Sequence, residues 1–168
     1  MSILNIKTYP ARVLKEKAEA VKSIDGRLQQ LIANMVETMY NASGVGLAAP
    51  QVGVSRRLIV VDTAYREHGS SNGLVVIINP EIVYQEGQDS GIEGCLSLPR
   101  FTVAMDRYAR VYVRGIDADG NPVEIESTGL FSRALQHEID HLNGVLLIDR
   151  LSPVQKQNFS SSFLKLNQ

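Results

Sequence analysis

Apolar residues recur at three- and four-residue steps between positions 26 and 41. The recurring residues are Leu28, Leu31, Ile32, Met35, Val36 and Met39. One turn of an α-helix takes about 3.6 residues, so these side chains share one face. The pattern predicts a helix over 26–41 that packs this face, both methionines included, into a core.

Shorter apolar runs and alternating segments follow in the middle of the chain. Continuous or alternating apolar patterns bounded by turn residues are typical of β-strands. The predicted strands cover 57–62, 74–80, 81–86, 102–116 and 122–126. The segment Asp117-Ala118-Asp119-Gly120-Asn121 predicts the hairpin turn between the last two, and the polar residues 64–73 predict a loop.

The two ends of the chain give weaker signals around a second clear helix. Residues 1–10 indicate an extended segment and 11–17 a short helical turn. A second helix is predicted over 129–143, because Asn143-Gly144 is typical of a helix C-terminus. A short strand or coil is expected at 145–148, and Ser152-Pro153 predicts the start of a last helix.

Helices and antiparallel strand signals are mixed without a βαβ rhythm, which favours the α+β class. We expect mostly antiparallel sheets packed around the helix at 129–143, with an N-terminal and a C-terminal helix. The length of 168 residues predicts a single domain over 1–168.

Composition narrows the possible partners and compartments. The chain has 17 basic and 18 acidic residues, so a DNA-binding surface is not expected. Cys95 is the single cysteine, which excludes an internal disulfide and fits a reducing cytosol. No signal peptide, transit peptide or membrane-length apolar run is evident. We therefore expect a cytoplasmic bacterial protein that does not bind membranes.

The predicted helix at 129–143 carries a His-Glu-x-x-His motif. His137 and His141 are four residues apart and share one helix face, where two imidazoles can hold one metal ion. Glu138 then lies close to any water on that ion. The motif predicts a catalytic metal site, which needs a third protein ligand and one open position.

Cys95 is the best candidate for the third ligand. Downstream of His141 the chain offers only Asp149, and His68 lies in a polar segment expected at the surface. A small buried hydrophobe is the structural alternative for Cys95. Two other functions stay open: a metallopeptidase that cuts internal peptide bonds, and a metal-stabilised interaction domain. The latter usually has four protein ligands.

Three motifs together resemble those of the peptide deformylases. They are Gly44-Val45-Gly46-Leu47-Ala48-Ala49-Pro50-Gln51, Glu93-Gly94-Cys95-Leu96-Ser97-Leu98-Pro99 and Gln136-His137-Glu138-Ile139-Asp140-His141. The first is also the small, apolar segment 44–53, which by itself predicts a tightly packed turn between helix and sheet. The resemblance extends over nearly the whole chain. It implies an enzyme that removes the formyl group from the initiator methionine of nascent polypeptides and releases formate.

The resemblance implies a role for each matching residue. Cys95, His137 and His141 hold one divalent metal ion, with Fe(II) as the native ion and Zn, Ni or Co as possible replacements. A metal-bound water attacks the formyl carbon while Glu138 acts as general acid and base. The Gln51 side-chain amide and the Leu96 backbone N–H stabilise the oxyanion.

Substrate-binding residues follow from the same resemblance. Val45, Gly46 and Gly94 offer backbone hydrogen bonds to an extended peptide. The helix face formed by Leu130, Arg133, Ala134 and His137 is expected to line the pocket for the methionine side chain, with Arg133 contributing its aliphatic stem.

Structural alternatives stay open for three charged residues. Arg133 and Arg107 equally fit ion pairs with a carboxylate such as Glu93. Asp140 is expected to support the site or the helix rather than to bind metal.

The C-terminal segment suggests one further partner. From Arg150 to Gln168 the chain has no acidic residue, while Arg150, Lys156 and Lys165 are basic. Such a helix can contact ribosomal RNA, although a solvated packing helix is the simpler interpretation. A monomer is expected.

Overall fold

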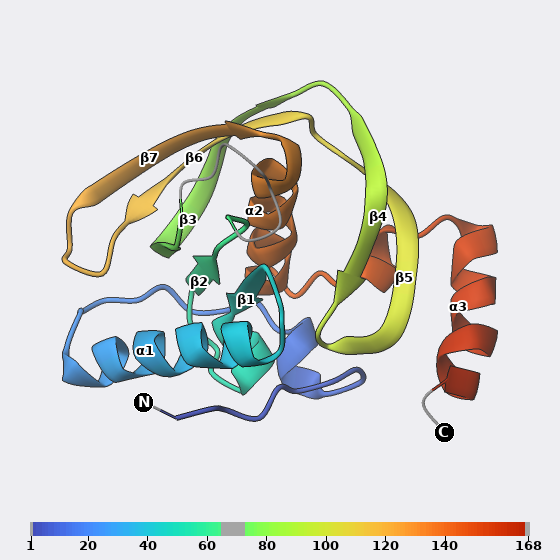
Figure 1. Ribbon diagram of the computed structural model, residues 1–168, viewed down its shortest axis with the longest axis horizontal. Coiled ribbons are helices and arrows are strands. Elements are labelled where there is room, and N and C mark those ends of the chain that lie inside the picture. Colours follow the sequence, from blue (N-terminus) through green and yellow to red (C-terminus); the bar gives the residue numbers. More distant parts are fainter. Residues whose placement is uncertain (1, 65–72, 167–168) are drawn as a thin grey trace.

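The structure, a computed structural model, describes residues 2–64 and 73–166 (Figure 1). The helical elements are η1 (Arg12–Lys15), α1 (Gly26–Asn41), η2 (Ala49–Val52), α2 (Gly129–Leu142), η3 (Leu147–Arg150) and α3 (Pro153–Leu166), where η denotes a 3-10 helix. The strands are β1 (Gly46–Ala48), β2 (Leu58–Val61), β3 (Val75–Glu86), β4 (Asp89–Cys95), β5 (Leu98–Arg107), β6 (Arg110–Ile116) and β7 (Pro122–Thr128).

The strands form two antiparallel sheets. One has five strands in the order β1-β2-β3-β6-β7, and the other is the two-stranded hairpin β4-β5. Figure 1 shows α2 between these sheets, with α1 below β1 and β2 and α3 beyond the hairpin. The expected α+β class, with antiparallel sheets around a central helix, is confirmed.

Helix α2 lies in the middle because nearly all of its surface is apolar or hydrogen-bonded inside the protein. Phe131, Leu135, Ile139 and Leu142 are buried and pack with Ile59, Val61, Ile77, Val111 and Val113 of the five-stranded sheet. Each such buried side chain contributes on the order of 1.5–3 kcal/mol of hydrophobic stabilisation. This packing fixes the rotation of α2, and so decides which of its side chains face the β4–β5 hairpin.

The predicted helix over 26–41 is confirmed as α1. The Asp25 carboxylate caps its first turn by accepting a hydrogen bond from the Leu28 N–H at 2.9 Å. Leu28, Ile32, Met35 and Met39 are buried in one cluster, with Leu31 and Val36 packed against it. The core role expected of both methionines is therefore correct.

Two predicted strand boundaries are wrong. Residues 74–80 and 81–86 form the single strand β3, because the chain passes Asn79 with φ 53° and a register shift instead of ending there. Residues 102–116 contain two strands, β5 and β6, joined by a tight turn at Tyr108 and Ala109. Strand β4 was not anticipated at all.

Two short segments also differ from expectation. The turn expected at 44–53 contains the three-residue strand β1 and the 3-10 helix η2, both buried. A strand or coil is expected at 145–148, but only residues 145–146 are coil, and the 3-10 helix η3 begins at Leu147. In η3 the Asp149 carboxylate accepts the Leu146 N–H at 2.8 Å, which favours a tight helical turn.

The last helix is confirmed as α3 and docks on the outside of the hairpin. Phe159 and Phe163 are buried, and Phe159 contacts the rings of Phe101 and Tyr9 at centroid distances of 4.9 and 5.8 Å. His68 lies outside the described residues. Among the described helices, none has the length and hydropathy needed to cross a membrane.

Candidate metal centre

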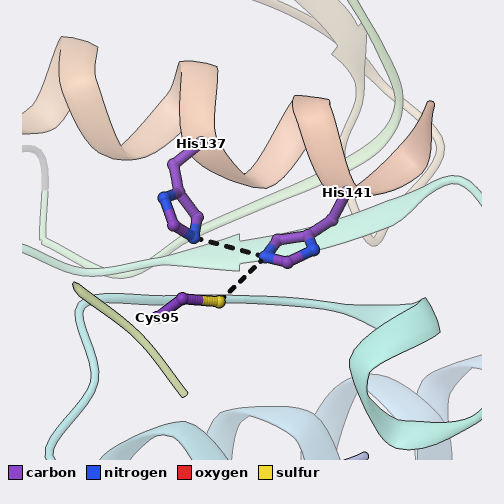
Figure 2. A group of neighbouring side chains, drawn as sticks. All are labelled: Cys95, His137 and His141. Atoms are coloured by element: carbon purple, nitrogen blue, oxygen red, sulfur yellow. Dashed lines mark hydrogen bonds between the residues drawn. The ribbon is translucent and has the colours of Figure 1, made fainter. Parts of the chain in front are cut away.

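Helix α2 and the end of β4 bring together three side chains that could hold a metal ion (Figure 2). His137 Nε2 and His141 Nε2 are 3.2 Å apart, because four residues advance the helix by about one turn. Cys95 Sγ lies 3.4 Å from His141 Nε2, on the strand facing the helix. All three ligand atoms lie within 4.8 Å of one another.

The chemistry of this group fits a divalent metal ion. One thiolate and two imidazoles are a common donor set for borderline-soft divalent ions. Burial lowers the pKa of His141 well below its ordinary value, so its imidazole is neutral and able to coordinate. The other ring nitrogen of His137, Nδ1, contacts a carboxylate oxygen of Glu93 at 3.0 Å. That contact directs Nε2 of His137 toward the group.

Glu93 carries a buried negative charge and contacts His137. It accepts two hydrogen bonds from the Arg107 guanidinium, both at 2.8 Å, and one from Arg133 at 2.6 Å. Burial by itself would raise the pKa of Glu93, but hydrogen bonds from Arg107 and His137 hold that pKa well below its ordinary value. Glu93 is therefore a fixed anion that orients His137.

Glu138 lies next to the ligand group and is enclosed on one side by Gly46. A Cβ atom on Gly46 would be 2.6 Å from Glu138 Oε2, so only glycine leaves room for this carboxylate. Its other oxygen, Oε1, is buried and has no hydrogen-bond partner in the described part of the chain. Burial raises the pKa of Glu138 to about 7, which suits a group that exchanges protons near neutral pH.

Gln51 is held with its amide nitrogen toward Cys95. Its Oε1 accepts the Ala48 N–H at 3.0 Å, which fixes the orientation of the amide. Its Nε2 lies 3.1 Å from Ser97 Oγ and 3.7 Å from Cys95 Sγ. This buried N–H donor is thus positioned at the ligand group by the fold.

A cavity of about 500 Å³ opens beside these residues. Its walls include every residue expected at the site except His141: Val45, Gly46, Gln51, Gly94, Cys95, Leu96, Leu130, Arg133, Ala134, His137 and Glu138. Ile92, Arg100, Phe101 and Thr102 also line the cavity, which the sequence did not suggest. The cavity is large enough for one amino-acid side chain and a short stretch of backbone.

Comparison with known proteins decides the family. The model of the family described as polypeptide deformylase matches residues 3–157. The chain belongs to the polypeptide deformylase family. Enzymes of this family depend on a metal and remove the N-formyl group from nascent peptides.

Individual relatives cover almost the whole chain. The peptide deformylase of Thermodesulfovibrio yellowstonii is 60% identical over 163 residues, covering 97% of this chain and 98% of that protein. A crystal structure of the Legionella pneumophila peptide deformylase aligns with a TM-score of 0.90 and 43% identity, over 98% of this chain and 95% of that one. The Ehrlichia chaffeensis peptide deformylase in complex with actinonin gives a TM-score of 0.91 and 36% identity, over 100% and 99% of the two chains.

The arginines and Asp140 adopt the structural arrangements left open by the sequence. Arg107 and Arg133 both pair with Glu93, and Arg133 also donates to the backbone oxygens of Met105 and Asp89 at 3.0 and 2.7 Å. Only the remainder of the Arg133 side chain is left to line the cavity. Asp140 accepts hydrogen bonds from two arginines instead of facing the ligand group.

Sequence reasoning named Glu93 as an ion-pair partner for the two arginines but missed its contact with His137. A usable signal was present, because residues two apart on a strand point to the same side, and Glu93 and Cys95 are two apart on β4. Without the strand assignment, the placement of Glu93 on the same side of β4 as Cys95, facing His137, could not be inferred.

Proposed function

We propose that Cys95, His137 and His141 hold one divalent ion, and that the adjoining cavity binds the formyl-methionyl end of a nascent peptide for hydrolysis. The convergence of the three ligand atoms beside the enclosed carboxylate of Glu138 is the observation that carries this proposal. We further propose that residues 1–168 act as one catalytic domain.

Glu138 is the general acid and base in this proposal. When bound, the ion acts as a Lewis acid that lowers the pKa of a coordinated water and polarises the formyl carbonyl. Glu138 Oε1 accepts a proton from the attacking water and later delivers it to the departing amine nitrogen. A pKa of about 7 lets the same carboxylate perform both transfers.

Gln51 and Leu96 stabilise the oxyanion that forms from the formyl oxygen. The Gln51 amide is anchored through its own oxygen and through the Nε2–H that donates to Ser97 Oγ, so the second Nε2–H is already held toward the site before the reaction. Leu96 directly follows Cys95, and its side chain packs close to Gly44. That contact supports the position of its backbone N–H at the cavity.

The peptide binds as an added strand between two sheet edges. Strand β1 is an edge strand of the five-stranded sheet, and within the described residues β4 pairs only with β5. Val45 and Gly46 from one side and Gly94 from the other line the cavity. Such edges offer backbone donors and acceptors to an extended peptide, independent of its sequence.

The methionine side chain occupies the part of the cavity lined by α2. Leu130 and Ala134 supply apolar walls, and Arg133 supplies its aliphatic stem because its guanidinium is committed to Glu93 and Asp89. The inhibitor actinonin, bound to the Ehrlichia chaffeensis relative, is expected to bind the same cavity here.

We assign Fe(II) as the native ion, with Zn, Ni or Co as functional replacements. The thiolate of Cys95 supports a borderline-soft ion but does not choose among these. Iron beside an oxidisable thiolate predicts faster loss of activity in air than under argon. Equal half-lives of iron-loaded protein under both gases would contradict this assignment.

The enzyme is proposed to act as a monomer in the bacterial cytoplasm and to touch the ribosome through α3. Lys156 and Lys165 are exposed, while Phe159 and Phe163 dock the helix on the hairpin. Reversing both lysines to glutamate should reduce co-sedimentation with ribosomes and leave peptide turnover unchanged, because neither side chain lines the cavity. Unchanged co-sedimentation would remove the ribosome contact.

The reaction class is tested by offering two substrates to the same metal-loaded protein. A short formyl-methionyl peptide should release formate, whereas casein should remain intact because the cavity accepts one chain end beside the ligand group. Cleavage of casein without formate release would favour the metallopeptidase alternative.

A further inference from the structure

Six charged side chains form a continuous series of ion pairs that runs from β4 to the end of η3. In order they are Asp89, Arg133, Glu93, Arg107, Asp140 and Arg150. The half of this series up to Arg107 surrounds Glu93 and supports His137. In the other part, among the described residues, Arg107, Asp140 and Arg150 form no hydrogen bond or ion pair with the side chains of Cys95, His137 or His141.

Asp140 is shared between two guanidinium groups. Its Oδ2 accepts from Arg107 Nη1 at 2.6 Å and from Arg150 Nε at 2.6 Å, while its Oδ1 accepts from Arg150 Nη2 at 2.6 Å. The Asp140 side chain is 13% exposed, so these contacts are only partly screened by water. Arg150 thus engages both oxygens of Asp140, and Arg107 shares Oδ2 with it.

We propose that Arg150 is a positioning residue for the metal centre. Its two-pronged hold keeps Asp140 turned so that Arg107 reaches it with Nη1 alone. Arg107 then keeps Nε and Nη2 for the two oxygens of Glu93, and Glu93 holds Nδ1 of His137. Without Arg150, the freed Oδ1 of Asp140 competes for the Arg107 guanidinium and loosens its alignment on Glu93.

The surroundings of Arg150 allow an effect on the retention of the ion to be distinguished from an effect on substrate binding. Arg107, Asp140 and Arg150 line a second cavity of about 290 Å³, which shares no wall residue with the first. The Arg150 side chain is 48% exposed, so its replacement leaves no buried hole. A change at Arg150 should therefore alter the retention of the ion before it alters the affinity for peptide.

The test is the rate at which zinc-loaded protein releases Zn(II) to excess chelator, with no peptide present. Replacing a residue that directly supports a metal ligand typically weakens metal binding about 10–100-fold. Arg150 acts three contacts farther away than Glu93, so Arg150→Gln should release Zn(II) about 3–10-fold faster than wild type. Arg150→Lys, which keeps the charge but cannot form the two-pronged contact, should lie between them.

Lys15→Ala is the matched control. Lys15, in η1, pairs at 2.5 Å with Asp149, which lies in η3 together with Arg150; their side chains are 43% and 36% exposed. Lys15 has no contact with Asp140 in the described part of the chain. It should release Zn(II) at the wild-type rate. The Asp140→Asn/Arg150→Gln double variant should be no faster than Asp140→Asn alone, because both changes interrupt one series.

Release from Arg150→Gln at the wild-type rate would overturn the proposal. So would equal acceleration by Lys15→Ala, which would indicate general loosening of η3, or additive effects in the double variant. The inference rests on the proposed metal centre, but its readout uses no formyl peptide. Failure of this connection and failure of the proposed reaction are therefore distinguishable.

Discussion

Replacing Glu93 by glutamine removes the charge under the metal centre while nearly keeping the shape of the side chain. The Glu93 side chain is 5% exposed and accepts four contacts, two from Arg107 at 2.8 Å, one from Arg133 at 2.6 Å and one from His137 at 3.0 Å. In the variant one oxygen becomes an NH₂ group, which faces guanidinium or imidazole N–H donors. Two buried arginines then lose their shared carboxylate partner, Glu93.

Removing one partner of a buried ion pair typically costs about 3–5 kcal/mol, because the remaining charge is left without compensation. Arg107 keeps Asp140 as a second carboxylate and Arg133 keeps Asp89, which favours the lower half of that range. For a chain of this size, about 2–4 °C of melting temperature corresponds to each kcal/mol. We therefore expect the midpoint to fall by about 6–16 °C.

The assay is thermal unfolding of chelator-treated protein, so that lost metal binding does not add to the measured change. Glu86→Gln is the matched control, because Glu86 also pairs with an arginine, Arg110, but its side chain is 47% exposed. Exposed ion pairs contribute little, so this control should keep the wild-type midpoint. A Glu93→Gln midpoint equal to that of Glu86→Gln would refute the reasoning.

Three further changes test separate parts of the site and fold. Gly46→Ala places a Cβ 2.6 Å from Glu138 Oε2 and should reduce formate release at least about tenfold, whereas Gly26→Ala, with nothing within 4 Å, should not. Gln51→Leu should lower turnover by about 10²–10³ at unchanged metal content, because one oxyanion donor is lost; turnover within a few-fold of wild type would exclude that role. Phe159→Ala removes a buried ring and should lower the free energy of unfolding, measured in urea, by about 3–5 kcal/mol. An unchanged urea midpoint would show that α3 docks otherwise.

The helices were predictable because their signals are local. The periodic apolar residues of 26–41 and the Asn143-Gly144 ending of α2 each lie within one element. The spacing of His137 and His141 likewise follows from the helix alone. Tertiary packing only confirmed what these short-range patterns indicate.

The strands were harder because their boundaries depend on pairing. Asn79 and Pro80 resemble a strand end, yet the Asn79 side chain bonds the backbone of Val21 at 2.8 and 3.0 Å and carries β3 through the bulge. Strand β4 contains two glycines and several polar residues. Its strand conformation comes from pairing with β5, which single-sequence patterns do not reveal.

The site shows the same division between local and long-range information. The motifs identified the candidate metal ligands and Glu138. The ion pairs among Arg107, Asp140 and Arg150, in contrast, connect β5, α2 and η3. No spacing rule relates an arginine at one position to a carboxylate ten residues away on another element. Such partners emerge only when the packing of α2 is known.

The most direct test of the central claim is formate release from a short formyl-methionyl peptide by anaerobically purified, metal-loaded protein, with Glu138→Ala measured at equal metal content. Rapid release by wild type that is lost in the variant is the predicted result, because the variant keeps Cys95, His137 and His141 but lacks the proton-transferring carboxylate. No release by fully metallated wild type, or equal release by the variant, would contradict the account.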